Sequence, residues 1–317
     1  MGARWGLVAV TAVAPMAWGT TFLVTTELLP PDRPLLAATL RALPAGLLLT
    51  AVMRRLPRGE WWWKAAVLGV LNIGAFFALL FVSAYRLPGG VAAVLGAVGP
   101  LVVAALSVPL LGARLRLTSL VLGVAGAAGV ALVVLGATAR LDLVGVLAGV
   151  AATTSSAAGI VLTKRWGRPV PLLAFTGWQL AAGGLVLVPL TLLVEGPPPA
   201  LTTANLAGFA YLGAVGTALA YTLWLRGIQL LPAENVSFLG LVSPLVAATV
   251  GWLVLGQALT PLQLVGVAVA LASILLAQLP PRVARPVPAS VPAEIMGPAP
   301  SSVGLADDLA CGVTRLR

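Results

Sequence analysis

The sequence predicts an all-α polytopic membrane protein with ten transmembrane helices, arranged as two inverted five-helix repeats with both termini in the cytoplasm. Three observations predict this fold class: the scarcity of charge, the length of the uncharged runs and a repeat within the chain. The 317 residues are 60% hydrophobic and only 9% charged. The surface of an ordinary soluble domain needs many more charged side chains, so a water-soluble globular fold is excluded.

Long uncharged runs give the number of membrane crossings. They contain 27, 23 and 47 residues at positions 87–113, 117–139 and 235–281. A helix needs about 20 apolar residues to cross a bilayer, so these runs correspond to one, one and two crossings. Applied to the whole chain, the criterion predicts ten spans at residues 5–28, 34–53, 62–85, 88–112, 117–137, 142–163, 171–194, 203–225, 234–256 and 259–279.

The two ends of the chain need separate interpretations. The first apolar run extends from Trp5 to about Leu29, which is long for the apolar region of a secretory signal peptide, so we expect a retained span. Residues 280–317 are rich in Pro, Ala and Ser and predict a disordered cytoplasmic tail. The chain has one cysteine, Cys311, in this tail, so an intrachain disulfide is excluded.

The distribution of Lys and Arg predicts the orientation. The N-terminus and every second loop contain most of the 19 basic residues, whereas the intervening loops contain only Arg33, Arg86 and Arg140. Basic residues concentrate in cytoplasmic loops, so both termini should be cytoplasmic. We expect a multi-pass protein of the plasma (inner) membrane of a bacterium. Because the basic residues lie in short loops between apolar runs, the net charge of +10 does not indicate nucleic-acid binding.

A repeat divides the chain into two halves. The segment LGAVGPLV at 95–102 recurs as LGLVSPLV at 239–246, with six of eight positions identical at an offset of 144 residues. The 29-residue segments around them share 12 positions, including Pro100 with Pro244. Shared leucines are expected by chance in membrane spans, but prolines and glycines in the same order are less so. The pattern therefore indicates an internal repeat.

A second block extends the repeat to earlier spans. PLLAATLRALPAGLL from Pro34 matches PLLAFTGWQLAAGGL from Pro171 at nine of 15 positions. Each half then has five spans, in residues 1–140 and 141–279. Because five is odd, the second half enters the membrane from the opposite side, which gives an inverted-topology repeat. Such repeats suit alternating access around a central site near the bilayer midplane.

Together these features resemble the drug/metabolite transporter superfamily, specifically its ten-span EamA-type carriers. The resemblance covers about residues 5–279. It is carried by AWGTTFL at 17–23, Arg41 in the second span, the proline-to-glycine frame shared by spans four and nine, and GQALTPLQLVG at 256–266. The resemblance implies export or exchange of small metabolites, such as amino acids, or of drugs, across the plasma membrane.

Carboxylates are scarce in the predicted spans. EamA-type carriers often have Glu after the glycine that ends spans four and nine, where this chain has Ala113 and Gln257, so no role of that carboxylate is transferred. The chain has no histidine, and its acidic residues nearest the spans lie near span ends: Glu27, Asp142, Glu195 and Glu234. A proton-coupled carrier usually needs a titratable group that both faces reach in turn. We therefore favour facilitated transport or exchange, with no cofactor and no metal.

Arg41 is the ionisable residue furthest inside a predicted span. Charge within the bilayer is costly, so such a residue is a functional candidate by default. Arg41 lies about seven residues into span two, or ~10 Å at 1.5 Å per residue. In one interpretation its planar guanidinium faces the cavity and binds a substrate carboxylate or phosphate. In the other, it extends to the outer face or pairs with Glu27.

Aromatic and polar residues in five spans are further candidates for a substrate site. Small-molecule sites combine aromatic walls with a few polar groups. The alternative for each Thr or Ser is a hydrogen bond to its own helix or to a neighbouring one. Besides Arg41, the candidate substrate-binding residues are Trp18, Thr20, Asn72, Thr154, Ser155, Trp178, Gln179, Tyr221 and Trp224.

Pro100 and Pro244 occupy equivalent positions in spans four and nine, and we interpret them as paired bends. Proline removes a backbone hydrogen bond, but in lipid the neighbouring spans can satisfy the freed carbonyl. As a hypothesis, the two bends are hinges that let each span flex as the cavity changes sides. The alternative is a static kink that serves packing.

Other function classes fit the sequence less well. An intramembrane enzyme needs a nucleophile with a base, a carboxylate pair or a metal cluster, and the chain has no histidine and no cysteine in a span. A channel needs a continuous polar path, and an assembly protein needs no pseudo-symmetric halves. We therefore expect a non-enzymatic secondary transporter.

The expected transporter exports or exchanges small metabolites such as amino acids, by alternating access around a central cavity. A multidrug efflux carrier and a non-transporting membrane assembly protein stay as alternatives. A cationic drug would need a buried acidic residue, and none is central, so zwitterionic or anionic metabolites are favoured. The expected partners are a small-molecule substrate and the lipid bilayer, with no nucleic acid and with a homodimer left open.

Overall fold

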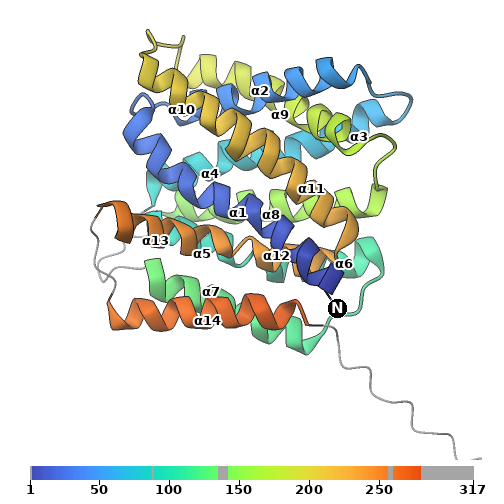
Figure 1. Ribbon diagram of the computed structural model, residues 1–317, viewed down its shortest axis with the longest axis vertical. Helices are drawn as coiled ribbons and strands as arrows, with labels where there is room; N and C mark the ends of the chain where they lie inside the picture. Colours follow the sequence, from blue (N-terminus) through green and yellow to red (C-terminus); the bar gives the residue numbers. More distant parts are fainter. Residues whose placement is uncertain (1, 88, 135–141, 256–259, 280–317) are drawn as a thin grey trace, which may run out of the picture. The chain divides into compact units, whose positions relative to one another are not determined.

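The computed structural model describes residues 2–87, 89–134, 142–255 and 260–279. Within these ranges all regular structure is helical (Figure 1). The elements are α1 (Gly2–Leu28), α2 (Pro34–Met53), α3 (Trp61–Gly69), η1 (Val70–Gly74), α4 (Ala75–Arg86), α5 (Gly89–Ala97), α6 (Gly99–Leu111), α7 (Leu117–Val134), α8 (Leu143–Trp166), α9 (Leu172–Val194), α10 (Thr203–Gly213), η2 (Ala214–Leu219), α11 (Ala220–Leu230), α12 (Ala233–Leu239), α13 (Val242–Leu255) and α14 (Pro261–Ala277).

The helices agree with the predicted spans, apart from the count. In the described part of the chain, nine helical segments are long and apolar enough to cross a membrane. They are Arg4–Thr25, Pro34–Met53, Trp61–Ser83, Ala93–Leu111, Leu117–Val134, Leu143–Trp166, Leu172–Val194, Thr203–Leu230 and Ala233–Val254. The tenth predicted span contains the shorter apolar helix Pro261–Ala277. The predicted disordered tail at 280–317 lies outside the described residues.

Several helices begin at polar caps that the local sequence supplies. The carboxylate of Asp142 accepts from the N–H three residues further along α8 (2.7 Å). Thr202 with Asn205, and Thr260 with Gln263, form capping boxes at the starts of α10 and α14. These side chains satisfy N–H groups that have no partner within the helix, so they fix where each helix begins.

Two antiparallel helix pairs lie at opposite ends of the stack, α2 with α9 and α7 with α14 (Figure 1). Small residues bring each pair close. A Cβ on Gly46 would overlap the main chain of Ala181, and a Cβ on Gly129 would lie 2.8 Å from the main-chain oxygen of Gly266. Membrane helices associate largely by such close packing of small residues. The pairs join the second predicted span to the seventh, and the fifth to the tenth.

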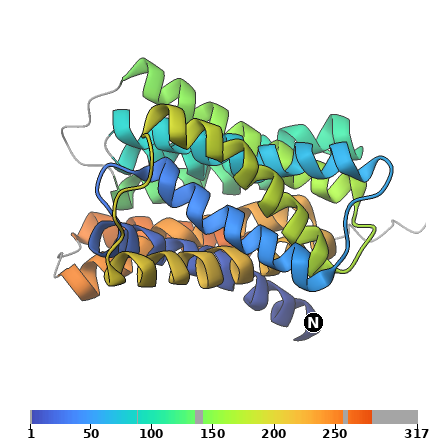
Figure 2. The same cartoon turned by 90° about the horizontal axis from the view of Figure 1, so that it is seen from above.

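The other helices form two groups. In the first group, α1 packs against α10, η2 and α11, and against α12 and α13. In the second group, α8 packs against α4 and η1, and against α5 and α6. Figure 2 shows α1, α10 and α11 on one side and α4, α5 and α8 on the other, with α2 and α9 nearest the viewer. Each group therefore combines one helix from one half of the chain with two segments from the other half.

Matching irregularities occur in both groups. The π-helical segments η1 and η2 begin at Val70 and Ala214, which are 144 residues apart, the same offset as the sequence repeat. The fourth span is interrupted between α5 and α6, just before Pro100, and the ninth between α12 and α13, just before Pro244. The helices thus break close to both prolines.

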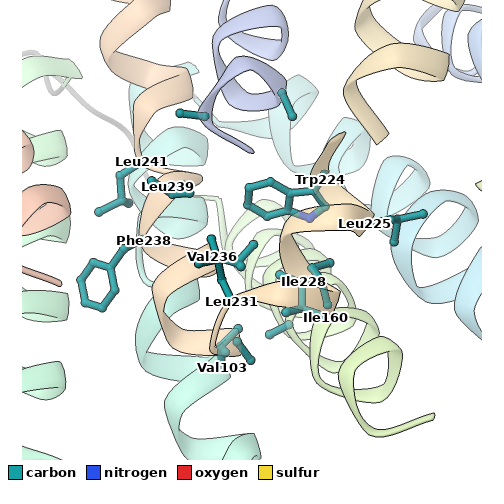
Figure 3. Packing of buried hydrophobic residues seen from close by; sticks show 14 of the residues in the cluster. Val103, Ile160, Trp224, Leu225, Ile228, Leu231, Val236, Phe238, Leu239 and Leu241 are labelled. Atoms are coloured by element: carbon teal, nitrogen blue, oxygen red, sulfur yellow. The ribbon is translucent and has the colours of Figure 1, made fainter. Parts of the chain in front are cut away.

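Buried apolar side chains meet where the two groups touch. Val103 of α6, Ile160 of α8, Trp224 and Ile228 of α11, and Val236 of α12 lie together there (Figure 3). We call these five residues the interface cluster. Each is at most 7% exposed. The cluster seals the contact of α11 and α12 with α6 and α8.

The loops fall on two faces. Loops 54–60, 112–116 and 167–171 lie at one side, on the right of Figure 1, and their arginines are exposed. We call this side the basic face. Loops 29–33 and 195–202 lie at the opposite face, where Arg33 donates to the main-chain oxygen of Glu195.

Candidate functional site

Arg41 is buried in α2, with only 6% of its surface exposed. Its Nε donates to the hydroxyl of Thr217 (2.8 Å), and its Nη2 donates to the main-chain oxygen of Gly216 (2.8 Å). Its Cζ also lies 5.2 Å from the centre of the Phe77 ring. The side chain therefore points inward to η2, whereas the acidic candidate Glu27 is exposed.

The charge of Arg41 is not balanced by a carboxylate within the described residues. The ion pairs found there are Lys64 with Glu60 and Arg86 with Asp142. Both hydrogen-bond acceptors of Arg41 are neutral, and its Nη1 donates no hydrogen bond within the described part of the chain. A buried cation is normally paired, because taking it out of water is costly. The arrangement therefore suits an anionic group as an additional partner.

The main-chain oxygen of Gly216 accepts a second hydrogen bond, from Nε1 of Trp18 in α1 (3.0 Å). A π-helical turn shifts the regular hydrogen-bond pattern of a helix and is frequent at functional sites. A Cβ at Gly216 would lie 3.3 Å from Nη2 of Arg41, so a larger residue here would require the guanidinium to shift slightly. η2 thus presents one oxygen to two donors from two other helices.

Two further aromatic rings pack against Trp18, which donates to this oxygen. The ring of Trp18 lies 5.2 Å from that of Tyr221 and 5.1 Å from that of Trp224, measured between ring centres. Both contacts are tilted or edge-on, which is favourable for aromatic pairs. Trp18, Arg41 and Tyr221, three of the sequence-predicted residues, are therefore brought together around η2, with Trp224 at the edge of the group.

A second polar group is centred on Asn72 in η1. Its Nδ2 donates to Oε1 of Gln179 in α9 (2.9 Å) and, more weakly, to Oγ1 of Thr163 in α8 (3.4 Å). Its main-chain oxygen accepts from the hydroxyl of Tyr221 (3.3 Å). That last bond joins the groups around η1 and η2. Nε2 of Gln179 is buried without a hydrogen-bond partner in the described part of the chain, so a donor remains available there.

The hydroxyl of Ser155 in α8 donates to the main-chain oxygen of Leu71 in η1 (2.9 Å). In the other group, Nε1 of Trp18 in α1 donates to the main-chain oxygen of Gly216 in η2. Each π-helical segment thus receives a side-chain donor from the long helix of its group. Ser155 and Trp18 support the two polar groups from equivalent helices.

The structure places three other predicted residues away from these groups. Thr154 is exposed and donates to Val150 of its own helix (2.8 Å), so it points away from the polar groups. Trp178 is buried, but its Nε1 donates to the main-chain oxygen of Arg55 at the basic face (2.6 Å). Thr20 lies against Tyr211 of α10, 2.8 Å between hydroxyl oxygens. Thr154 and Trp178 therefore lie apart from the candidate site around η1 and η2. Helical position alone did not show which side of α8 or which end of α9 they occupy.

Four residues of the site were missed at the sequence level: Phe77, Thr163, Gly216 and Thr217. Gly216 could have been found, because it lies 144 residues after Asn72 and aligns with it in the repeat. Phe77, Thr163 and Thr217 carried no comparable signal, since such residues are common in membrane helices.

The acidic residues near the spans make structural contacts. The carboxylate of Glu195 accepts from the N–H groups of Leu35 (2.5 Å) and Leu36 (2.9 Å) at the start of α2, and that of Glu234 accepts from Ser119 (2.7 Å). Within the described ranges, no three His, Cys, Asp or Glu side chains come together as metal ligands. The polar groups around η1 and η2 are therefore the best candidate for a binding site.

Sequence comparison with known proteins places the chain in a family. A model of the EamA-like transporter family matches residues 4–135 and again residues 143–279. The chain is 47% identical over 267 residues to Protein PecM of Dickeya dadantii (strain 3937), which covers 84% of this chain and 90% of that protein. It is 27% identical over 278 residues to the uncharacterized transporter YwfM of Bacillus subtilis (strain 168), covering 85% of this chain and 93% of that one.

A protein of known crystal structure has the same fold. It superposes with a TM-score of 0.73 at 21% identity, over 87% of this chain and 98% of that one. At this identity the match concerns the fold alone. The two matches to the family together span most of residues 4–279, so this chain belongs to the EamA-like transporter family and is a multi-pass membrane transporter.

Proposed function

We propose that the protein is a secondary transporter for small metabolites that contain a carboxylate, amino acids included. It moves them by alternating access around a site formed by Arg41 and the groups at η1 and η2. Export or exchange is the proposed direction. The proposed location is the inner membrane of a bacterium, with both termini in the cytoplasm, where the basic face lies.

The observation that carries the proposal is the buried, unbalanced charge of Arg41. Two of its nitrogens bind Gly216 and Thr217, so the guanidinium is held in one orientation, and Nη1 is left for a substrate. A guanidinium binds carboxylates in a planar, directional way. A cationic substrate would be repelled by the same group, so the site favours anions and zwitterions.

The other proposed substrate contacts surround Arg41. Trp18, Tyr221 and Trp224 offer aromatic surface, and Asn72 and Gln179 offer polar atoms beyond Tyr221. Such a mixture of aromatic surface and few polar groups is typical of small-molecule sites. Thr20 and Ser155 act on this site indirectly, through Tyr211 and Leu71.

The arrangement of the helices supports two inverted five-helix repeats, in residues 1–140 and 141–279. The family matches twice, once in each half. The matching π-helical segments, the paired interruptions near Pro100 and Pro244, and the pairing of α2 with α9 all relate one half to the other. In this proposal α14 is the tenth span, and the interruptions are hinges that let the two groups of helices separate at one face at a time.

The test is transport of a panel of solutes by purified protein in proteoliposomes, measured as counterflow. We expect counterflow of at least one amino acid or carboxylate and none of organic cations. Arg41→Ala should abolish it while the protein stays folded and monodisperse, and Arg41→Lys should retain part of it. The matched control is Arg86→Ala, because Arg86 is exposed and pairs loosely with Asp142 at 3.7 Å. Unchanged kinetics in Arg41→Ala would refute the proposal.

A further inference from the structure

Lys164 joins the two groups of helices at the basic face. It lies in the last turn of α8, and its Nζ donates to the main-chain oxygens of Gln229 (2.8 Å) and Leu231 (2.9 Å) at the end of α11. Gln229 in turn donates from Nε2 to the main-chain oxygen of Thr163 (3.1 Å). The last carbonyls of a helix have no partner within it, and a cation is favourable there. Three hydrogen bonds thus hold α8 to α11.

The interface cluster lies directly beside these bonds. Ile160 is one turn before Lys164 in α8, and Ile228 precedes Gln229 in α11. Both isoleucines are at most 5% exposed and pack with Val236 and Val103 (Figure 3). A dry apolar contact of this kind excludes water, and the polar bonds lie between it and the basic face.

A chain of hydrogen bonds connects this contact to the centre of the protein. Thr163, whose main-chain oxygen binds Gln229, has its hydroxyl 3.4 Å from Nδ2 of Asn72. The main-chain oxygen of Asn72 then accepts from Tyr221 (3.3 Å). The route runs from the basic face to the ring that packs on Trp18. Movement of α8 relative to α11 would therefore change the positions of Asn72 and Tyr221 at the proposed substrate site.

We infer that Lys164, Gln229 and Thr163 form a latch that keeps the transport path closed at the basic face, with the interface cluster as its seal. The inference rests on the proposed function, because alternating access requires the two groups to part at one face while they meet at the other. The three latch residues are positioning residues, which act by holding α8 against α11. Removing the ammonium of Lys164 shifts the equilibrium toward the state that is open at the basic face.

The test uses the rate at which a water-soluble maleimide labels a single cysteine in the purified full-length protein. Cys311, the one native cysteine, is replaced by serine. One probe is Val236→Cys, in the interface cluster, and the other is Ala38→Cys, which is buried in α2 away from the latch. Each probe is combined with Lys164→Met, with Lys164→Arg, which keeps donors, and with Lys64→Met. Lys64 is a matched control because it binds Glu60 of its own segment (2.5 Å).

We expect Lys164→Met to raise labelling of Val236→Cys by at least about tenfold, the order of change when charged hydrogen bonds that favour one of two states are lost. Lys164→Arg and Lys64→Met should label like the parent, and Ala38→Cys should stay unlabelled throughout. Unchanged labelling of Val236→Cys in Lys164→Met overturns the latch. A parallel rise at Ala38→Cys also overturns it, because Lys164 would then only stabilise the fold. The labelling assay contains no substrate. An error in the proposed substrate class would therefore change the counterflow result and leave the labelling result unaffected.

Discussion

Tyr221 of α11 donates its hydroxyl to the main-chain oxygen of Asn72 in η1, at 3.3 Å. The bond crosses from one group of helices to the other and joins the polar groups around η1 and η2, two segments that belong to different halves of the chain. The ring of Tyr221 also makes a tilted contact with that of Trp18, 5.2 Å between ring centres. One side chain therefore combines an aromatic contact within its own group with a polar contact to the other group.

Removing only the hydroxyl separates these two contributions. Tyr221→Phe should lower the free energy of unfolding by about 0.5–1 kcal/mol, the usual value of a hydrogen bond between membrane helices. Tyr221→Ala should cost about 3–5 kcal/mol, because it also leaves a cavity beside Trp18. Thermal unfolding in detergent measures both. Equal losses for the two variants would contradict the assignment of most of the energy to the ring.

Asn72 and Gln179 should be energetically coupled. Asn72→Ala leaves the carbonyl of Gln179 without its donor at 2.9 Å, and an unpaired buried polar group costs about 1–3 kcal/mol. Gln179→Ala removes the partner, so the double variant should be about 0.5–1.5 kcal/mol more stable than the sum of the single effects predicts.

The control for this cycle pairs Asn72→Ala with Gln263→Ala. Gln263 caps α14 and donates to Val133 (2.9 Å), with no contact to Asn72, so these effects should add. Denaturation of the purified protein gives all the values. Additive effects for Asn72 and Gln179 would show that their contact contributes no stability.

The α7–α14 contact depends on the absence of a side chain at Gly129. A Cβ there would lie 2.7 Å from the main-chain nitrogen of Ala270 and 2.8 Å from the oxygen of Gly266, so Gly129→Ala should cost about 1–3 kcal/mol through overpacking. Gly96→Ala is the matched control in α5, since no atom lies within 4 Å of the position that a Cβ would occupy there. That variant should be neutral or up to about 1 kcal/mol more stable. A common melting temperature for the two would refute the close packing.

Glu195 should act as a cap for α2 from the neighbouring helix. Glu195→Ala removes the acceptor for the N–H groups of Leu35 and Leu36, and should cost about 1–2 kcal/mol, as the loss of a helix cap does. Glu195→Gln keeps one carbonyl acceptor and should lose less. Thermal unfolding ranks the three proteins. If Glu195→Ala melted with the parent, the cap would have no energetic role.

Much of the fold could be predicted from the sequence because hydrophobicity dominates in a bilayer. The uncharged runs placed nine spans close to the observed helices, and the apolar helix Pro261–Ala277 lies within the tenth predicted span. Pro100 and Pro244 also indicated where two spans break. Each of these inferences depends on the composition along the chain, because hydrophobic length and the positions of charged residues determine which segments cross the bilayer.

The partners of the buried polar groups could not be predicted. Arg41 was found as a charge in a span, but its binding to Gly216 and Thr217 depends on how α2 packs against η2. Thr154 and Ser155 are adjacent in sequence, yet only Ser155 reaches the neighbouring η1. Rotation of a helix about its axis decides this, and uniformly apolar helices give no amphipathic pattern from which to read it.

The oxygen at Gly216 that binds both Arg41 and Trp18 belongs to the backbone. Every amino acid supplies that atom, so no point mutation deletes it. Variation among descendants of this gene can alter the donors, crowd the position with a larger side chain or change the length of η2 by insertion or deletion. Divergence in substrate choice should therefore accumulate at Arg41 and Trp18 and their neighbours, while the acceptor between them is inherited unchanged.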